Sequence, residues 1–174
     1  QYVKQECIEA FEGYFVAEAA SPSQTRCPLG YYTDSRGSVE CNLVSPGHYT
    51  TTEGAAAQTP CSYGTYQPES GQSSCHYADE GHHVPEEGAS QQTPCAPGSY
   101  QALSAMQYCI DTDPGYHTPE PGMTEQVICS AGTFQPDAGQ GICHQAFHFY
   151  NFLPYFINGM LWIYNMFKNI FTNC

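Results

Sequence analysis

The chain has 174 residues and a formal net charge of −13 at pH 7, and only four of its residues are lysine or arginine. Proteins that bind nucleic acid neutralise its phosphates with clustered Lys and Arg, so this composition excludes nucleic acid as a partner. Charged residues make up only 12% of the chain, which also contains 16 glycines and 13 prolines. Aliphatic side chains are sparse between Cys7 and Cys143. An ordinary hydrophobic core is therefore not expected there, and covalent cross-links must replace it.

Cysteines occur at fixed intervals along the chain. Nine of the ten are separated by alternating 20-residue and 14-residue steps, which together make a 34-residue period. Such a period is typical of repeat proteins in which each unit contacts its neighbours, so we expect an elongated array over residues 1–143. The cysteines are Cys7, Cys27, Cys41, Cys61, Cys75, Cys95, Cys109, Cys129 and Cys143, followed by Cys174.

Glycines mark a kernel that both kinds of step share. The 14-residue steps read C-x2-G-x6-G-x3-C and the 20-residue steps read C-x5-G-x6-G-x6-C. Because both contain G-x6-G, the 34-residue unit is expected to consist of two diverged copies of one smaller hairpin. Ala20 and Ala105 replace the second glycine in two copies. We expect those two turns either to avoid a positive φ or to accept a small strain for it.

Aromatic and β-branched residues follow the first glycine of the kernel, and Pro, Glu, Ser and Asp come next. This order predicts a short strand that enters a turn. The sequence therefore predicts a small disulfide-rich fold, mostly β and irregular, with very short strands and very little helix before residue 144. The expected strand residues are Tyr14, Phe15, Tyr31, Tyr32, Tyr49, Tyr66, Tyr100, Tyr116 and Phe134.

Ten cysteines, nine of them periodic, predict a disulfide framework formed in an oxidising, extracellular setting. Zinc sites favour closely spaced C-x2-C pairs, which this sequence lacks. Two pairings between neighbouring cysteines remain open. Closing the 14-residue steps leaves Cys7 and Cys174 over, whereas closing the 20-residue steps joins Cys143 to Cys174 and uses every cysteine.

The short segments resemble a known family. "CPLGYYTDSRGSVEC", "CSYGTYQPESGQSSC", "CAPGSYQALSAMQYC" and "CSAGTFQPDAGQGIC" are similar to the C-x-x-G-x-Y modules of ephrin-receptor-like cysteine-rich repeats, and more distantly to tumour-necrosis-factor-receptor domains. The resemblance covers Cys7 to Cys143, although this chain lacks the C-x-x-C links between modules. In those families the short loop is commonly closed by its own two cysteines, so the resemblance implies the 14-residue pairing.

Acidic residues concentrate in the 20-residue steps, where equivalent loops would form one solvated face. Asp111 and Asp113 could form a calcium site, but no EF-hand or nonapeptide calcium motif is present. We expect no metal and no cofactor. The sequence also contains no nucleophile, phosphate-loop, zinc-protease or dinucleotide motif, so we expect no catalytic residues and no enzyme activity.

Histidines occupy two adjacent repeat positions. His48 and His82 are one period apart, and His83 and His117 take the next position, where other copies have Tyr or Phe. Because His alternates with Tyr and Phe at these repeat positions, the pattern favours a role for the flat ring in packing. A metal-binding or pH-sensing stripe is the alternative.

Residues 144–174 differ sharply from the array. They are rich in aromatic and aliphatic side chains, and Lys168 is the single charge. Asparagines at a seven-residue spacing would give a helix a narrow polar stripe. We predict a hydrophobic, helical segment that packs against other copies of the chain, with a membrane anchor as the alternative and a removable lipid-anchor signal as a third reading. The expected assembly residues are Phe149, Phe152, Tyr155, Phe156, Leu161, Trp162, Phe167 and Phe171.

These observations predict an extracellular structural protein. We expect a disulfide-stapled rod that self-assembles into a filament or surface layer through residues 144–174, with other copies of itself as its partners. The alternative is a membrane-anchored, receptor-like or adhesive ectodomain that binds a protein or glycan. The sequence contains no N-glycosylation sequon, whereas its Thr- and Ser-rich loops are candidates for O-linked sugar.

Overall fold

The structure, a computed structural model, describes residues 9–146. All regular secondary structure in this part of the chain consists of two-residue β-strands, and each odd-numbered strand is hydrogen-bonded to the even-numbered strand that follows it. The first strands of the hairpins are β1 Tyr14–Phe15, β3 Tyr31–Tyr32, β5 His48–Tyr49, β7 Thr65–Tyr66, β9 His82–His83, β11 Ser99–Tyr100, β13 Tyr116–His117 and β15 Thr133–Phe134. The second strands are β2 Thr25–Arg26, β4 Asn42–Leu43, β6 Thr59–Pro60, β8 His76–Tyr77, β10 Thr93–Pro94, β12 Ile110–Asp111, β14 Val127–Ile128 and β16 His144–Gln145.

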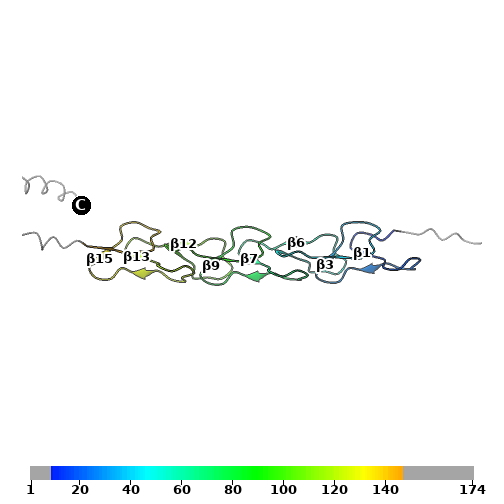
Figure 1. Ribbon diagram of the computed structural model, residues 1–174, viewed down its shortest axis with the longest axis horizontal. Helices are drawn as coiled ribbons and strands as arrows, with labels where there is room; N and C mark the ends of the chain where they lie inside the picture. Colours follow the sequence, from blue (N-terminus) through cyan, green and yellow to red (C-terminus); the bar gives the residue numbers. More distant parts are fainter. Residues whose placement is uncertain (1–8, 147–174) are drawn as a thin grey trace, which may run out of the picture. The chain divides into compact units, whose positions relative to one another are not determined.

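The hairpins recur at half the period of the cysteines. Their first strands begin at residues 14, 31 and 48 and continue at the same spacing to residue 133. Each begins directly after the first glycine of a kernel. Figure 1 shows the hairpins following one another along an elongated array from β1 to β15. The predicted fold class is confirmed for the array, including the prediction that each 34-residue unit contains two copies of one hairpin.

Backbone hydrogen bonds join each hairpin to the next. Gly47 N donates to Gln67 O at 2.7 Å. Gly71 N, on the turn of the next hairpin, donates to Val44 O at 2.8 Å. Equivalent bonds recur at the preceding and following junctions; a threonine hydroxyl is the acceptor for Gly30 N and a second acceptor for Gly98 N. We call this series the backbone ladder. It lets hairpins with very short strands form a continuous structure, because backbone groups outside the strands also find partners.

A narrow column of small and polar side chains forms the core. One repeat position, just ahead of the first glycine of the kernel, is buried in most copies. Its buried occupants are Ala10, Cys27, Val44, Cys61, Ala78, Cys95 and Thr112. Buried glutamines lie nearby: Gln67 Nε2 donates to Ser74 O at 2.8 Å, and Gln67 Oε1 accepts from Glu69 N at 3.1 Å. Within residues 9–146 no buried side-chain nitrogen or oxygen lacks a hydrogen-bond partner, which is what makes so polar a core stable.

The first glycine of the kernel allows the chain to pass close to a later turn in six of the eight copies, from Gly13 to Gly98. Gly64 has a φ of +73°, and a Cβ atom placed on it would overlap the carbonyl oxygen of Ala105. Only glycine fits such a position. The second glycine of the kernel requires a positive φ but meets less crowding. At Ala20 and Ala105 the φ values are 59° and 61°, so these turns accept the left-handed conformation rather than avoid it.

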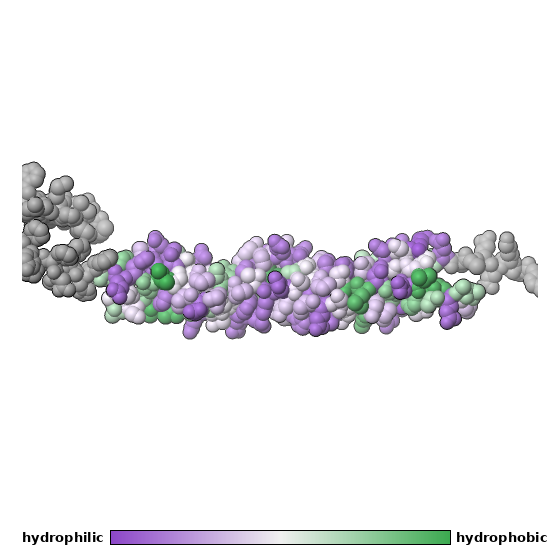
Figure 2. Space-filling model, in the orientation of Figure 1, coloured by the Kyte–Doolittle hydropathy of each residue, from purple (hydrophilic) through white to green (hydrophobic). Residues whose placement is uncertain are grey.

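The surface of the array is mostly polar. On the face drawn in Figure 2, apolar residues form separated patches among hydrophilic ones. Exposed apolar side chains such as Tyr77 and Val39 are 70% and 66% accessible. Among residues 9–146 no helix has the length and apolar character needed to cross a membrane. The array extends through β16, just past Cys143, and the helix predicted for residues 144–174 lies almost entirely outside the described residues.

Candidate functional site

Four disulfides cross-link the array, and each joins cysteines at a sequence separation of 14. The structure therefore has the pairing that the family resemblance implied, and the 20-residue pairing is not formed by these eight cysteines. Cys7 and Cys174 lie outside the described residues. The bridges are Cys27–Cys41, Cys61–Cys75, Cys95–Cys109 and Cys129–Cys143, with Cα–Cα separations of 5.7 to 5.9 Å.

Each disulfide closes one hairpin. Cys61 lies fully buried just before the turn into β7, and Cys75 lies half-buried directly before β8. The bridge therefore ties the entrance of the hairpin to its returning strand. The hairpins closed in this way are β3–β4, β7–β8, β11–β12 and β15–β16, and we call them the bridged hairpins.

A glutamine replaces the disulfide in the alternate hairpins. It occupies the position that the second cysteine has in a bridged hairpin, half a cysteine period away along the sequence. Gln92 Oε1 accepts a hydrogen bond from Asp79 N at 2.7 Å, and Gln92 Nε2 donates to Asp79 Oδ2 at 2.7 Å. The same backbone bond is made by Gln24 to Phe11, by Gln58 to Ser45 and by Gln126 to Asp113. We call β1–β2, β5–β6, β9–β10 and β13–β14 the glutamine-closed hairpins.

The role of these glutamines was not predicted from the sequence. The cysteine spacing indicates the 34-residue period, and only a shift of the sequence by half that period aligns the glutamines with the second cysteines. The array is therefore cross-linked at every hairpin, alternately by a covalent bond and by a side-chain hydrogen bond.

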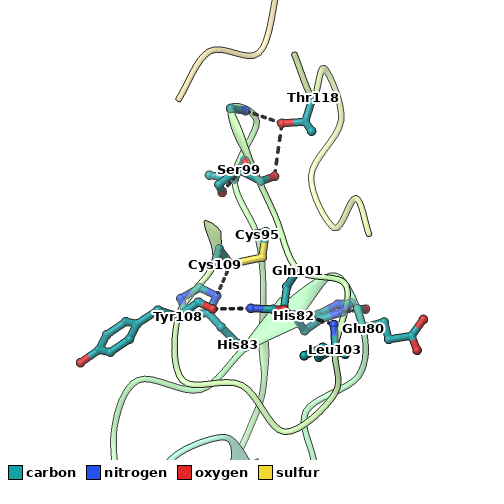
Figure 3. The surroundings of a disulfide bond; sticks show 12 residues. Glu80, His82, His83, Cys95, Ser99, Gln101, Leu103, Tyr108, Cys109 and Thr118 are labelled. Atoms are coloured by element: carbon teal, nitrogen blue, oxygen red, sulfur yellow. Dashed lines mark hydrogen bonds between the residues drawn. A yellow bond between two sulfur atoms is a disulfide. The ribbon is translucent and has the colours of Figure 1, made fainter. Parts of the chain in front are cut away.

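Two histidines lie against disulfide sulfurs. His83 Nδ1 is 3.2 Å from Cys109 Sγ, and His117 Nδ1 is 3.2 Å from Cys143 Sγ. Figure 3 shows the His83 ring beside the Cys95–Cys109 bridge. In each place the imidazole and both sulfurs have possible ligand atoms within 4.8 Å of one another. Sulfurs joined in a disulfide are not thiolates, and the thiolate is the form that binds metal.

The other two histidines of the predicted stripe face the backbone. His48 Nδ1 lies 3.2 Å from Pro46 O, and His82 Nδ1 lies 3.1 Å from Glu80 O. Both contacts are local, within a turn. The two histidine positions therefore have different surroundings, although they are neighbours in the sequence.

The carboxylates suggested for calcium are not gathered into a ligand cluster. Asp113 Oδ2 accepts a hydrogen bond from Gln126 Nε2 at 2.7 Å and so supports the closure of β13–β14. Asp111 lies on β12, where a Cβ atom added to Gly139 would come within 3.5 Å of its carboxyl carbon. Within residues 9–146 neither belongs to a group of three or more possible metal ligands.

The assembly residues predicted for the C-terminal segment, Phe149 to Phe171, lie outside the described residues. On the array itself a surface hollow of about 320 Å³ lies beside the turn between Val84 and Thr93. Its lining comes from that single turn and includes Pro85, Glu86 and Ala89. The cross-links are therefore the most distinctive chemical feature of the described residues.

Comparison with known proteins gives one family match. Residues 13–61 match the family described as tyrosine-protein kinase ephrin type A/B receptor-like. The matched segment runs from the start of β1 to Cys61 and includes the Cys27–Cys41 bridge. No curated protein matches the chain. Residues 13–61 are thus similar to a cysteine-rich repeat of the ephrin-receptor-like kind, within the range that the sequence resemblance covered. Disulfide-rich domains of this kind are typical of extracellular or cell-surface proteins.

Proposed function

We propose that this chain of ephrin-receptor-like repeats is an extracellular structural protein, non-catalytic, that self-assembles with other copies through residues 144–174. The observation that carries the proposal is the continuous cross-linking of the array. Every hairpin between β1 and β16 is closed by a disulfide or a glutamine, and the backbone ladder joins it to the next. Cross-links at every hairpin oppose local opening of the array, which suits a spacer or filament element.

The distribution of apolar side chains supports assembly through the C-terminal segment. On the face drawn in Figure 2 the described surface is mostly polar and its apolar residues lie in separated patches, and the chain carries a net charge of −13. Like charge keeps the faces of neighbouring arrays apart. Residues 144–174 contain a dense series of aromatic residues and one charge, and large apolar surfaces on proteins mark association sites.

Truncation tests the proposal. Because β16 belongs to the array, the chain should be cut after Ala146 rather than after Cys143. We expect residues 1–146 to keep their disulfides and to become a monomer, as measured by size-exclusion chromatography with light scattering. Trp162→Asp in the full chain should weaken assembly, because it would bury an unpaired charge, whereas Asn165→Asp, on the expected polar stripe, should have little effect. High-mass assemblies of the truncated chain would show that the repeats make the contacts.

The family match favours a second candidate function. Ephrin-receptor-like repeats over residues 13–61 would also suit a receptor-like or adhesive ectodomain that binds a protein or glycan and is anchored by its C-terminal segment. In that case the full chain would be a monomer that requires detergent. The truncated array would keep its ligand and lose only its attachment to membranes.

A further inference from the structure

Two of the four disulfides have an imidazole within reach of their sulfurs. His83 Nδ1 lies 3.2 Å from Cys109 Sγ, and Cys109 is bonded to the fully buried Cys95. His117 is placed in the same way beside Cys143, one cysteine period further along the chain. Each trio brings one nitrogen and two sulfurs together within 4.8 Å.

The first two bridges lack this arrangement. The strand position of His83 on β9 is occupied by Tyr49 on β5 and by Phe15 on β1. All three residues pair with a threonine two positions before a cysteine, so they are equivalent in register. The described residues thus contain two histidine-bearing bridges and two bridges of the same geometry with a ring that offers no imidazole nitrogen.

We propose that reduction of the two histidine-bearing bridges converts each of them into a three-ligand site for Zn²⁺. A dithiol reductant supplies two electrons to the sulfur–sulfur bond and becomes a cyclic disulfide, leaving two cysteine thiols. When the metal binds, both thiols release their protons to water and bind as thiolates. The imidazole is the third ligand and water takes the fourth position. Two thiolates and one imidazole are a ligand set that zinc favours.

The geometry of the oxidised site is close to what the metal requires. Tetrahedral zinc, with bonds of about 2.3 Å to sulfur and about 2.0–2.1 Å to nitrogen, holds its ligand atoms about 3.5–3.8 Å apart. The nitrogen–sulfur distance at His83 is already 3.2 Å. Breaking the disulfide lets the two sulfurs separate, which is the movement that the metal needs.

The backbone ladder keeps the ligands in place after reduction. Cys95 N donates to Gly81 O at 2.8 Å, and Cys95 O accepts from Gly122 N at 2.8 Å. Neither bond depends on the disulfide. The glutamine-closed hairpins adopt the same fold without a bridge, so a reduced hairpin can remain folded while the metal takes over the cross-link.

The two sites should differ in affinity. His117 Nδ1 also lies 3.0 Å from Val127 O, and it must give up this hydrogen bond to bind a metal through Nδ1. His83 has no such competing contact among the described residues. The His83 site should therefore fill before the His117 site.

The test uses the full chain, reduced and then freed of reductant without oxygen. Co²⁺ provides a coloured stand-in for zinc, and a competing chelator suppresses weak binding to other thiols. We expect two ions per chain, with thiolate-to-cobalt absorption bands. Zn²⁺ should displace Co²⁺ and raise the melting temperature. The unreduced protein should show none of these changes.

Two matched double variants distinguish metal binding that needs the imidazoles from metal binding by the cysteines alone. His83→Tyr with His117→Phe makes both bridges like the first two and leaves all ten cysteines. We expect its affinity for both ions to fall by about tenfold or more, since loss of even a supporting residue has such an effect. His48→Tyr with His82→Tyr removes two histidines elsewhere and should bind like the wild type. Equal affinity in the first variant, or failure of the reduced wild type to bind, would overturn the proposal.

Discussion

The hairpins β7–β8 and β9–β10 are neighbours with the same fold and different closures. The first is closed by the Cys61–Cys75 disulfide. The second is closed by Gln92, whose side chain is hydrogen-bonded to the backbone nitrogen and to the carboxylate of Asp79. Their strands have the same length, and both use the same backbone ladder. The shape of a hairpin therefore does not depend on its covalent bond. The glycine kernel and the ladder specify the fold, and the cross-link sets how strongly each hairpin is held.

The two closures differ in strength. A disulfide that closes a loop of this size contributes about 3 kcal/mol through the chain entropy of the unfolded state, whereas a side-chain hydrogen bond contributes about 1 kcal/mol. Because the two closures alternate, the glutamine-closed hairpins β5–β6, β9–β10 and β13–β14 each have a bridged hairpin on both sides. Through the hydrogen bonds of the backbone ladder, the bridged hairpins can then stabilise their glutamine-closed neighbours, as neighbouring units do in other repeat proteins.

The largest effect is expected at the glycine kernel. In Gly64→Ala the new methyl group would overlap the Ala105 carbonyl, and the backbone cannot move without opening the ladder. We expect a loss of about 4 kcal/mol or more in unfolding free energy, measured by denaturant titration. Gly37→Ala is the control, since it has a positive φ but open surroundings, and it should cost about 1–2 kcal/mol. Equal effects would mean that close packing at the first glycine is not what specifies the fold.

Removing one bridge should have the next largest effect. Cys61→Ala with Cys75→Ala should lower the unfolding free energy by about 3 kcal/mol. Cys61→Ala with Cys75→Gln recreates the closure seen at Ala78 and Gln92, so it should recover about 1 kcal/mol of that loss. In both variants the Ala78 amide, bonded to Gly64 O at 2.9 Å, should stay protected from hydrogen exchange. Loss of that protection would show that the hairpin needs its disulfide to fold.

The reverse substitution should add a bridge. Ala78→Cys with Gln92→Cys places cysteines at the two positions that are bridged in the neighbouring hairpins. We expect a disulfide to form and to raise the unfolding free energy by about 2 kcal/mol. This is the contribution of the bridge minus that of the lost glutamine hydrogen bond. Mass spectrometry with and without reduction detects the bond. Two free thiols in the folded variant would contradict the equivalence of the two kinds of hairpin.

The smallest effect is expected from a single glutamine. Gln92→Ala removes the acceptor of Asp79 N and should cost about 1 kcal/mol. Its neighbour Gln91 is exposed, so Gln91→Ala should change the unfolding free energy by less than about 0.5 kcal/mol. A comparison of melting curves is sufficient. If the two variants have the same stability, the glutamine hydrogen bond does not close the hairpin.

The array and the first strands of its hairpins could be predicted from the sequence because the turns require glycine and the strands that follow favour aromatic residues. The sequence did not predict the second strands, since pairs such as Thr59–Pro60 and His76–Tyr77 carry no strand pattern of their own and form only by pairing. Gln92 was missed because a polar residue in a loop is usually exposed. The contact between His83 and Cys109 joins residues 26 positions apart, which only the three-dimensional structure brings together.

The most direct test of the account is peptide mapping of the unreduced, full chain. Closure of alternate hairpins by disulfides predicts four linked peptide pairs, in which Cys27 is joined to Cys41, Cys61 to Cys75, Cys95 to Cys109 and Cys129 to Cys143. Each link lies within one hairpin. A link across a 20-residue step, such as Cys41 to Cys61, would place the covalent bond where the structure has a glutamine-closed hairpin, and it would contradict the account.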